Sequence, residues 1–291
     1  MSHKAGFVNI VGSPNVGKST LMNQMLGEKL SIVTSKAQTT RHRIHGIVNG
    51  DDYQVVFSDT PGVVNASYKL HEQMMSYVDT SLKDADILIF ITDIFENEMN
   101  HSETLERIQR LKIPVLLIIN KIDLGDQDKV VERISYWRER LPAAEIIPTS
   151  ALHGFNKEWI WDKIIEFLPE SPAYFDKEDI SDRPLRFFIS EMIREKIFLY
   201  TDKEIPYSSQ VEIEEYKEME NIIHIRAQII VERDSQKGII IGKGGTMLKR
   251  IGYDARRDIE AFVGKQVFLK TFVKVDKDWR TDESKLKKYG Y

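Results

Sequence analysis

The sequence predicts an α/β domain with a mostly parallel sheet, followed by a smaller α+β domain that opens with a helix. Up to about residue 168, short runs rich in valine and isoleucine alternate with amphipathic stretches, a pattern typical of a parallel sheet covered by helices. A proline-containing acidic stretch follows, and beyond it the order of elements changes. The 291 residues suffice for two domains that each bury a core. We place the first domain at residues 1–170, a linker at 171–183, and the second domain with a C-terminal tail at 184–291.

Five apolar runs in the first domain predict buried strands: FVNIV, YQVVF, DILIFI, PVLLII and EIIP. The stretch RIHGIVNGDDYQVVF reads as two strands joined by a tight turn, so we expect one antiparallel pair. Between the strands we expect helices that start near the following residues: Lys18, Lys69, Ser102, Lys129 and Lys157.

The second domain reads as helix, strand, strand, helix, glycine loop, helix, strand. LRFFISEMIREKIFLY has apolar residues at helical spacing, and NIIHIRAQIIVE alternates as a strand does. The glycine loop GKGG lies between two helical stretches, and QVFLKTFVKV predicts the last strand. In the tail, Trp279 and Tyr289 either stack on bases or dock on the domain, and the sequence does not choose between them.

Composition excludes several classes of site. The chain has no cysteine, which excludes disulfides, thiolate metal sites and cysteine nucleophiles. No secretory signal is visible, and the longest apolar runs fall far short of the roughly 20 residues of a membrane span. We therefore expect a cytoplasmic monomer with no transmembrane segment, and leave peripheral association with a membrane open.

Charge is distributed unevenly along the chain. The formal net charge is −4, but residues 183–291 hold 22 basic and 18 acidic residues. Residues 237–257 alone hold six basic residues and one acidic residue. This stretch predicts either a partner of opposite charge or an ordinary solvated face.

The stretch GSPNVGKST follows the first apolar run and predicts a phosphate cradle. It fits Gly-x4-Gly-Lys-[Ser/Thr] between a strand and a helix. Its glycines let backbone N–H groups approach phosphate oxygens, and the helix N-terminus adds partial positive charge. Lys18 would reach the outer phosphates, and Ser19 would bind Mg²⁺.

Two further stretches belong to the phosphate end. DTPG ends the strand YQVVF, where Asp59 would hold the metal through water and the N–H of Gly62 would approach a γ-phosphate. Taken alone, DTPG would be an ordinary turn. TSKAQTTRHR is polar and predicts a segment that orders around the γ-phosphate, with Thr40 as second Mg²⁺ ligand and Thr39 as the alternative. A plain solvent loop is the other interpretation.

NKID ends the strand PVLLII and indicates which base is bound. Guanine offers N1–H and an exocyclic amine to Asp123, whereas adenine lacks that pair of donors. Asn120 would bond the other edge of the base, and the stem of Lys121 would cover one ring face. SAL follows EIIP and would place a backbone N–H near guanine O6. Four motifs in this order, each at the end of a strand, predict GTP binding.

The predicted site residues are as follows. Lys18, Thr40 and Gly62 are the predicted catalytic residues, and Ser19, Thr40 and Asp59 the metal ligands. The nucleotide set is Gly12, Asn15, Val16, Gly17, Lys18, Ser19, Thr20, Asp59, Gly62, Asn120, Lys121, Asp123, Ser150, Ala151 and Leu152.

GKGG fits the Gly-x-x-Gly loop with which KH modules clamp four nucleotides of single-stranded RNA. Backbone must approach phosphates closely there, and nearby lysines and arginine would meet their charge. The predicted RNA-binding residues are Lys237, Ile241, Gly242, Lys243, Gly244, Gly245, Lys249 and Arg250. The alternative interpretation of GKGG is a glycine-rich helix cap in a dimerisation domain.

With these motifs in hand, the chain resembles the Era family of GTPases. GSPNVGKST, KAQTTRHR, DTPG, NKID and SAL are similar to its five nucleotide motifs, and GIIIGKGG to its KH module. The resemblance covers nearly the whole chain. It implies a GTP-hydrolysing switch in assembly of the small ribosomal subunit, which binds the 3′ end of its ribosomal RNA. The alternative is a GTPase whose C-terminal domain binds a protein.

The residues after DTPG bear on the rate. Ras-like proteins place a water-orienting glutamine there, whereas Val63 and Val64 follow Gly62 here. We therefore expect slow intrinsic turnover. At the position of Asn15 in the cradle, the chain resembles GTPases that have an asparagine there and recruit K⁺ beside the phosphates. We therefore hypothesise that K⁺ speeds GTP hydrolysis by this protein. Asn15 as a simple turn former is equally open.

Overall fold

The computed structural model describes residues 3–96 and 102–291, and they form two compact units. The first unit comprises residues up to Ser31, Thr40–Ala66 and His71–Asp182. The second comprises Ile32–Thr39, Ser67–Leu70 and Arg183–Tyr291. Two short stretches of the N-terminal half therefore group with the C-terminal unit.

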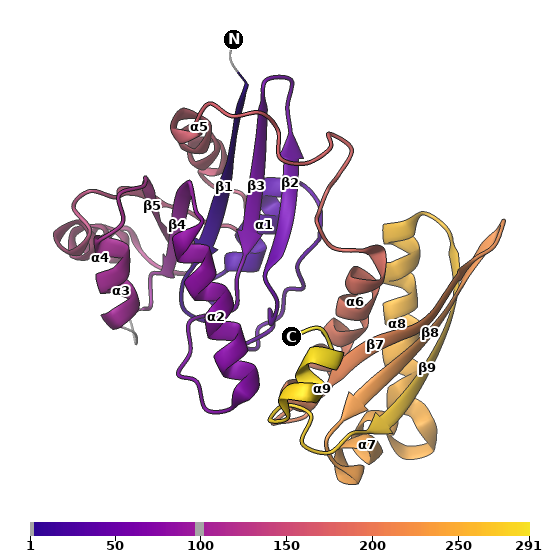
Figure 1. Cartoon of the computed structure of the whole chain (residues 1–291). Coiled ribbons are helices and arrows are strands. Elements are labelled where there is room, and N and C mark those ends of the chain that lie inside the picture. Colours follow the sequence, from indigo (N-terminus) through magenta and orange to yellow (C-terminus); the bar gives the residue numbers. More distant parts are fainter. Residues whose placement is uncertain (1–2, 97–101) are drawn as a thin grey trace. The chain divides into compact units, whose positions relative to one another are not determined.

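The first unit has a six-stranded, mostly parallel sheet with the order β2-β3-β1-β4-β5-β6, as the alternation predicted (Figure 1). Strands β2 and β3 pair antiparallel, which confirms the expected hairpin. Most strand residues are buried, because helices cover both faces of the sheet. The strands are β1 (Lys4–Val11), β2 (Ile44–Asn49), β3 (Tyr53–Asp59), β4 (Ile87–Asp93), β5 (Val115–Asn120) and β6 (Glu145–Pro148).

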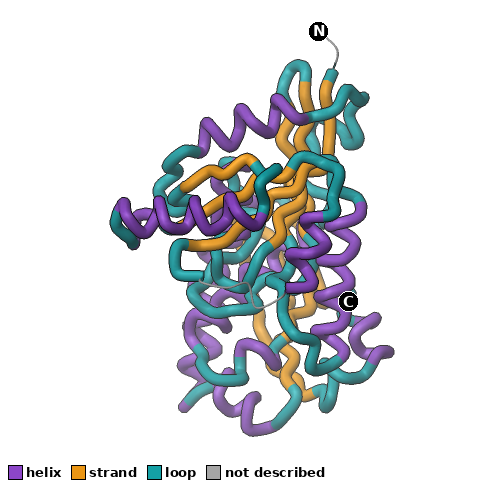
Figure 2. Tube along the Cα trace, turned by 90° about the vertical axis from the view of Figure 1, so that its left-hand side faces the viewer, coloured by secondary structure: helices purple, strands orange, loops and turns teal. Residues whose placement is uncertain are grey.

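Five helices pack on this sheet: α1 (Lys18–Leu26), α2 (Lys69–Lys83), α3 (Ser102–Gln109), α4 (Gln127–Arg140) and α5 (Lys157–Phe167). Helices α2, α3 and α4 share one apolar cluster with β4 and β5, whereas α1 and α5 contact each other. Helix α4 begins two residues before Lys129 because Asp126 caps it, accepting a 2.8 Å hydrogen bond from the N–H of Lys129. Figure 2 shows the strands with helices on either side.

The second unit has a three-stranded sheet in the order β7-β8-β9, with β8 and β9 parallel. The predicted order of elements is confirmed, and a short C-terminal helix is added. Apolar residues of α6, α8 and one face of β8 form its core. The elements are α6 (Leu185–Tyr200), β7 (Gln210–Glu218), β8 (Ile222–Val231), α7 (Asp234–Ile241), α8 (Thr246–Val263), β9 (Gln266–Val275) and α9 (Glu283–Lys288).

Helix α6 is buried over eleven consecutive residues, from Phe188 to Phe198. Charged side chains among them need partners, and the segment Ile32–Thr39 supplies several. The N–H of Val33 donates to Glu195 at 3.2 Å, and Arg194 donates to the carbonyl of Thr39 at 2.5 Å. Lys36 donates to the carbonyl of Phe198 at 2.7 Å, to that of Thr201, and to Asp202 at 2.8 Å. The segment thus packs along α6 and its C-terminal end.

The C-terminal tail docks on its own unit, which settles the choice that the sequence left open. Trp279 is fully buried and donates to the carbonyl of Ser208 at 3.0 Å. Tyr289 donates to Asp276 at 2.6 Å and packs edge-on against Trp279. Neither ring is exposed for stacking on bases.

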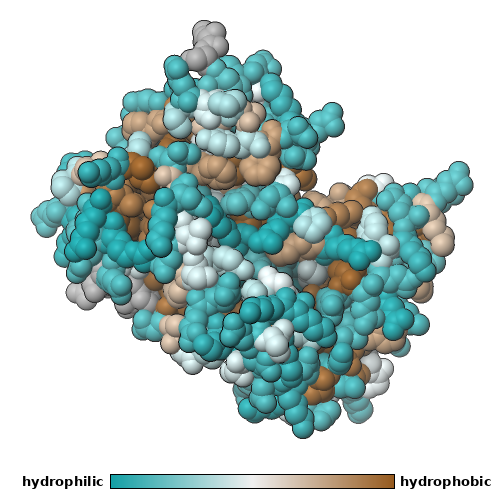
Figure 3. Space-filling view, viewed as in Figure 1, coloured by the Kyte–Doolittle hydropathy of each residue, from teal (hydrophilic) through white to brown (hydrophobic). Residues whose placement is uncertain are grey.

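No helix within residues 3–96 and 102–291 is long and apolar enough to cross a membrane. In the face shown in Figure 3, hydrophobic side chains form separate patches within a mainly hydrophilic surface.

Candidate functional site: a nucleotide site and a glycine clamp

The predicted nucleotide motifs all follow the carboxyl ends of strands in the first unit. The cradle follows β1, Asp59 ends β3, Asn120 ends β5, and Ser150 lies just after β6. Strands β1, β3, β4, β5 and β6 run parallel, so these ends meet at one edge of the sheet. Ligands bind at this edge in open α/β sheets.

Three glycines of the motifs occupy places where a side chain would collide. A Cβ on Gly12 would lie 2.1 Å from the carbonyl oxygen of Ile91, and one on Gly62 would lie 2.8 Å from Cα of Pro14. Gly17 has φ of +104°, and a Cβ on it would lie 2.2 Å from the side-chain nitrogen of Asn120. The spacing of the motif therefore reflects close backbone packing as well as room for phosphates.

At the phosphate end, hydroxyl and carboxylate oxygens converge. Ser19 Oγ donates to Asp59 Oδ2 at 2.7 Å and lies 3.0 Å from Thr40 Oγ1, which donates to the same carboxylate oxygen at 3.2 Å. Thr39 instead donates to the carbonyl of Lys36 within its own segment. Of the two threonines, Thr40 therefore lies with the other predicted metal ligands.

Charged groups at this end are buried. Burial lowers the pKa of Lys18 to about 8, although the charges of Asp59 and Glu96 oppose the shift. Lys18 Nζ donates to the carbonyls of Gly12 and Ser13 at 3.1 and 2.7 Å. Burial raises the pKa of Asp59, against the effect of the Ser19 hydroxyl and of Lys18.

The chemistry of this cluster fits Mg²⁺. The ion prefers oxygen ligands, and Ser19, Thr40 and Asp59 offer only oxygens. The second carboxylate oxygen of Asp59, Oδ1, is buried and has no hydrogen-bond partner among the residues that the structure describes. A buried oxygen without a hydrogen bond lowers the stability of the fold unless a ligand binds to it. Direct or water-mediated binding of a cation supplies that use.

At the base end, Asn120 ties three motifs together. Its amide nitrogen donates to the carbonyl of Val16 at 2.7 Å, and its oxygen accepts from the N–H of Ala151 at 2.8 Å. Val16, Asn120 and Ala151 are all buried. The cradle, NKID and SAL are thus held together by one side chain.

Lys121 and Asp123 flank this link. Lys121 has a left-handed φ of 61° and pairs with Asp93 at 2.8 Å. Asp123 is the first-turn carboxylate of a three-residue turn, and His153 lies 3.8 Å from it. The side chain of Asp123 is 24% exposed. These positions suit a base held between Lys121 and Asp123.

The other predicted nucleotide residues differ in burial. Ser150 is buried, whereas Leu152 is 68% exposed. Thr20 is half-buried in the first turn of α1. Asn15 has a left-handed φ of 65°, a conformation that asparagine tolerates better than most residues. Its presence therefore has a backbone reason independent of any cation.

Two acidic residues near the site were missed by sequence reasoning. Asp93 holds Lys121, and Glu96 accepts hydrogen bonds from Ser13 in the cradle and from Thr92, the latter at 2.7 Å. Both follow the run DILIFI, whose end at the same sheet edge was the available signal.

In the second unit, the GKGG loop joins α7 to α8 and has an unusual backbone. Gly242, Gly244 and Gly245 all have positive φ, at 72°, 61° and 78°. A Cβ on Gly242 would lie 2.7 Å from Met247, whereas Gly244 and Gly245 have open space around them. Lys243, Lys249 and Arg250 are exposed nearby, while Lys237 and Ile241 are half-buried. An exposed, cationic glycine loop is what a phosphate backbone requires.

Comparison with known proteins finds relatives that match the regions of both the nucleotide motifs and the GKGG loop. Residues 7–121 match the family described as 50S ribosome-binding GTPase, and residues 204–280 match the KH domain family. The chain is 39% identical to Era in a crystal structure with MgGDPNP and nucleotides 1506–1542 of 16S ribosomal RNA. That match covers 99% of both chains, with a TM-score of 0.95. The chain belongs to the Era family. A variant of Aquifex aeolicus Era bound to GDP·AlF4⁻ is 40% identical over 99% of both chains, with a TM-score of 0.94.

This member of the Era family has no water-orienting side chain directly after Gly62. Val63 is buried in the apolar cluster, and the N–H of Val64 contacts the sulfur of Met75 at 3.5 Å. Arg43 is engaged elsewhere, since its guanidinium donates to Ser58, Asp84 and Asn9. It braces the strands of the sheet.

Proposed function

We propose that this Era-family protein binds and hydrolyses GTP, releasing GDP and phosphate, and binds the single-stranded 3′ end of the small-subunit ribosomal RNA. The observation that carries the proposal is the match over 99% of the chain to an Era bound to both a GTP analogue and that RNA. The match spans both the nucleotide motifs and the GKGG loop. A role in assembly of the small ribosomal subunit follows from this RNA.

The residues at the phosphate end divide the work of hydrolysis. Lys18 would neutralise charge on the outer phosphates as water attacks the γ-phosphorus and GDP leaves. Mg²⁺, held by Ser19 and Thr40 with Asp59 alongside, would supply further neutralisation of the phosphate oxygens. Gly62 would present its N–H to the γ-phosphate. Asp123 and Asn120 would select guanine and fix the orientation of the nucleotide.

Intrinsic turnover is slow in this proposal. The side chains of Val63 and Val64 have no group that hydrogen-bonds water, and Arg43 is bound to other residues. Removing one electrostatic stabiliser typically costs an enzyme about 10²–10³ in rate. The missing contribution would come from the RNA complex, a partner or a cation.

The cation proposed is K⁺, held by Asn15. Asn15→Gly separates the two explanations for this residue, because glycine adopts the left-handed φ and removes the side-chain oxygen. If K⁺ binds there, the variant hydrolyses GTP at the same rate in KCl and NaCl while the parent is faster in KCl. Equal K⁺ stimulation of both proteins would assign Asn15 a backbone role alone.

The switch would reach the RNA-binding unit through the segment Ile32–Thr39. Thr40 lies with the metal ligands, and the adjacent residue Thr39 is held by Arg194 of α6. Ordering Thr40 around the γ-phosphate therefore pulls directly on a chain segment that packs on α6. Two sites biased by one element are the requirement for coupling.

RNA binding is tested with Gly244→Asp. Its carboxylate would point into the open space where phosphates approach, so affinity for the 37-nucleotide RNA from 1506 to 1542 should fall more than a hundredfold in a filter-binding assay. Gly290→Asp is the matched control, because Gly290 also has positive φ and open surroundings. GTP affinity of both variants should equal that of the parent.

The rival function, a second unit that binds protein, makes a different prediction. Phosphate contacts give an affinity that falls steeply with salt. Retained RNA affinity in Gly244→Asp, or RNA binding with no salt dependence, would favour the rival. The expected monomeric state and cytoplasmic location stay predictions from the sequence, and peripheral association with a membrane stays open.

A further inference from the structure

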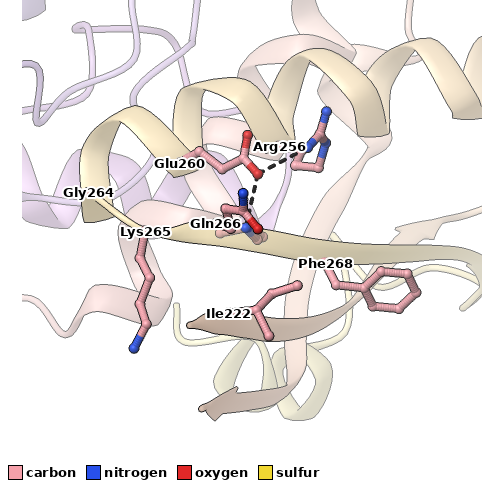
Figure 4. A pocket seen from close by; sticks show the side chains of 8 residues that line it. Ile222, Arg256, Glu260, Gly264, Lys265, Gln266 and Phe268 are labelled. Carbon is pink, nitrogen blue, oxygen red and sulfur yellow. Dashed lines mark hydrogen bonds and ion pairs between the residues drawn. The ribbon is translucent and has the colours of Figure 1, made fainter. Parts of the chain in front are cut away.

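A cavity of about 520 Å³ lies at the opposite end of α8 from the GKGG loop. It is open to solvent and lies within the size range of small-molecule sites. In Figure 4, Arg256 and Glu260 project from α8 on one side of β9, while Phe268 and Ile222 lie on the other side. Lys265 stands at the turn between α8 and β9. The cavity therefore wraps around the beginning of an edge strand.

The cations of the cavity are already paired. Arg256 binds Glu260 at 3.0 Å, and Lys265 binds Glu218 at 3.1 Å. Glu260 also accepts from the N–H of Val267 at 3.0 Å, which fixes the carboxylate. Because each cation has a carboxylate partner, the cavity offers little net attraction to a phosphate. It suits an uncharged group with a flat face.

Phe268 gives the cavity an aromatic surface. Its side chain is 52% exposed, and the ring of His224 is centred 5.3 Å away. Phe272 lies on the same face of β9 and is 37% exposed, but does not line the cavity. Exposed rings on a sheet are where RNA-binding domains stack unpaired bases.

Helix α8 and strand β9 connect the clamp to the cavity. Helix α8 starts directly after the GKGG loop and runs 18 residues, about 27 Å at 1.5 Å per residue. Along the way Gly252 packs against Thr271 of β9, so helix and edge strand stay side by side. A clamp of this type holds four nucleotides. A longer strand that follows this border passes the cavity.

From these observations, the geometry points to a second RNA subsite. One unpaired base outside the four-nucleotide clamp inserts into the cavity and stacks on Phe268, with Ile222 as its apolar neighbour on the same side of the sheet. This assignment rests on the proposed function, because the base belongs to the same RNA strand. Binding here depends on stacking rather than on charge.

The test compares Phe268→Ala with its matched control Phe272→Ala in binding the 37-nucleotide RNA. Loss of one stacked base weakens binding by about tenfold, so Phe268→Ala should lose roughly that factor. Phe272→Ala should bind within about twofold of the parent. Phe268→Tyr should restore affinity, and Phe268→Leu should not, because a base stacks on a ring. The slope of affinity against salt should be the same in all four variants.

The outcomes separate this inference from the one on which it rests. If the parent binds the RNA, Gly244→Asp abolishes binding and Phe268→Ala has no effect, the subsite is overturned and the proposed function stands. Equal losses in Phe268→Ala and Phe272→Ala, or rescue by Phe268→Leu, also overturn the subsite. If the parent does not bind the RNA, both are overturned. Thermal unfolding of each variant checks that these exposed substitutions leave the fold intact.

Discussion

The base end and the phosphate end of the nucleotide site are held in different ways. At the base end, Asn120 bonds to backbone groups of two other motifs, and Lys121 is paired with Asp93. At the phosphate end, Lys18 bonds to carbonyls of its own loop, and Ser19, Thr40 and Asp59 bond to one another. The groups that would recognise guanine are thus positioned by the rest of the fold. Those that would bind phosphate and metal bond to one another or to their own loop, and one carboxylate oxygen of Asp59 has no partner among the residues that the structure describes.

This difference teaches how one site combines selectivity with switching. Preorganised groups lose little free energy of ordering when the ligand arrives, so they can discriminate between bases. Groups that exchange internal hydrogen bonds for bonds to a ligand have two arrangements, and that is what a switch requires.

The largest effect is expected from Asp123→Asn. Asparagine presents an amine where guanine also has one, so affinity for GDP should fall about 10³-fold. Xanthosine diphosphate has a carbonyl at that position and should bind the variant better than GDP does. Isothermal titration with both nucleotides checks this, with ADP as a reference. Unchanged GDP affinity would mean that Asp123 does not contact the base.

Gly17→Ala should disturb the contact between the phosphate cradle and Asn120, which links the phosphate end of the site to its base end. The added methyl would lie 2.2 Å from the amide nitrogen of Asn120, at a φ of +104°. We expect nucleotide affinity to fall about a hundredfold and the free energy of unfolding to drop by about 1–3 kcal/mol. Gly27→Ala has the same kind of strain, with φ of +75°, but no neighbour within 4 Å. If both variants bind GDP equally well, the contact with Asn120 is unimportant.

Nucleotide affinity should depend on pH through Lys18. Burial holds the pKa of Lys18 near 8, and a phosphate favours its protonated form. Below that pKa the lysine is already charged and affinity is flat. Above it, binding must take up a proton, so affinity for GDP should fall by up to about tenfold per pH unit. Titrations between about pH 7 and 9 measure this slope, and Lys18→Arg, which stays charged, should abolish it.

The smallest effect is expected from Lys36→Ala. This substitution removes three hydrogen bonds between the segment Ile32–Thr39 and the end of α6. The ratio of RNA affinities measured with GDPNP and with GDP should shift by about fivefold, the lower range of such couplings. Lys112→Ala, which removes an exposed lysine of the first unit, should leave the ratio unchanged. An unaltered ratio in both variants would show that this segment carries no signal.

Much of the fold and of the site followed from local patterns. The alternation of runs predicted the six-stranded sheet, and the turn after Val48 predicted its antiparallel pair. Strand ends placed the cradle, Asp59, Asn120 and Ser150 at one edge, because parallel strands share it. These inferences need only the spacing of apolar residues along the sequence and the direction of the strands.

The remainder depended on contacts between residues far apart in the chain. Asp93 lies 28 positions before Lys121, and Arg194 lies 155 positions after Thr39. Neither pair leaves a periodic trace in the sequence. The tail was ambiguous for the same reason, since Trp279 bonds to Ser208, 71 positions away. Side-chain partners at such separations are set by tertiary packing alone.

The all-round burial of α6 has a consequence for dissecting the molecule. A fragment that starts at residue 184 would bring Glu195 and Arg194 into water, since Val33 and Thr39 would no longer cover them. Such a fragment contains the whole KH domain but lacks the segment Ile32–Thr39, which belongs to the same compact unit. RNA affinities measured on the excised domain would therefore describe a less tightly packed domain than the one in the intact chain.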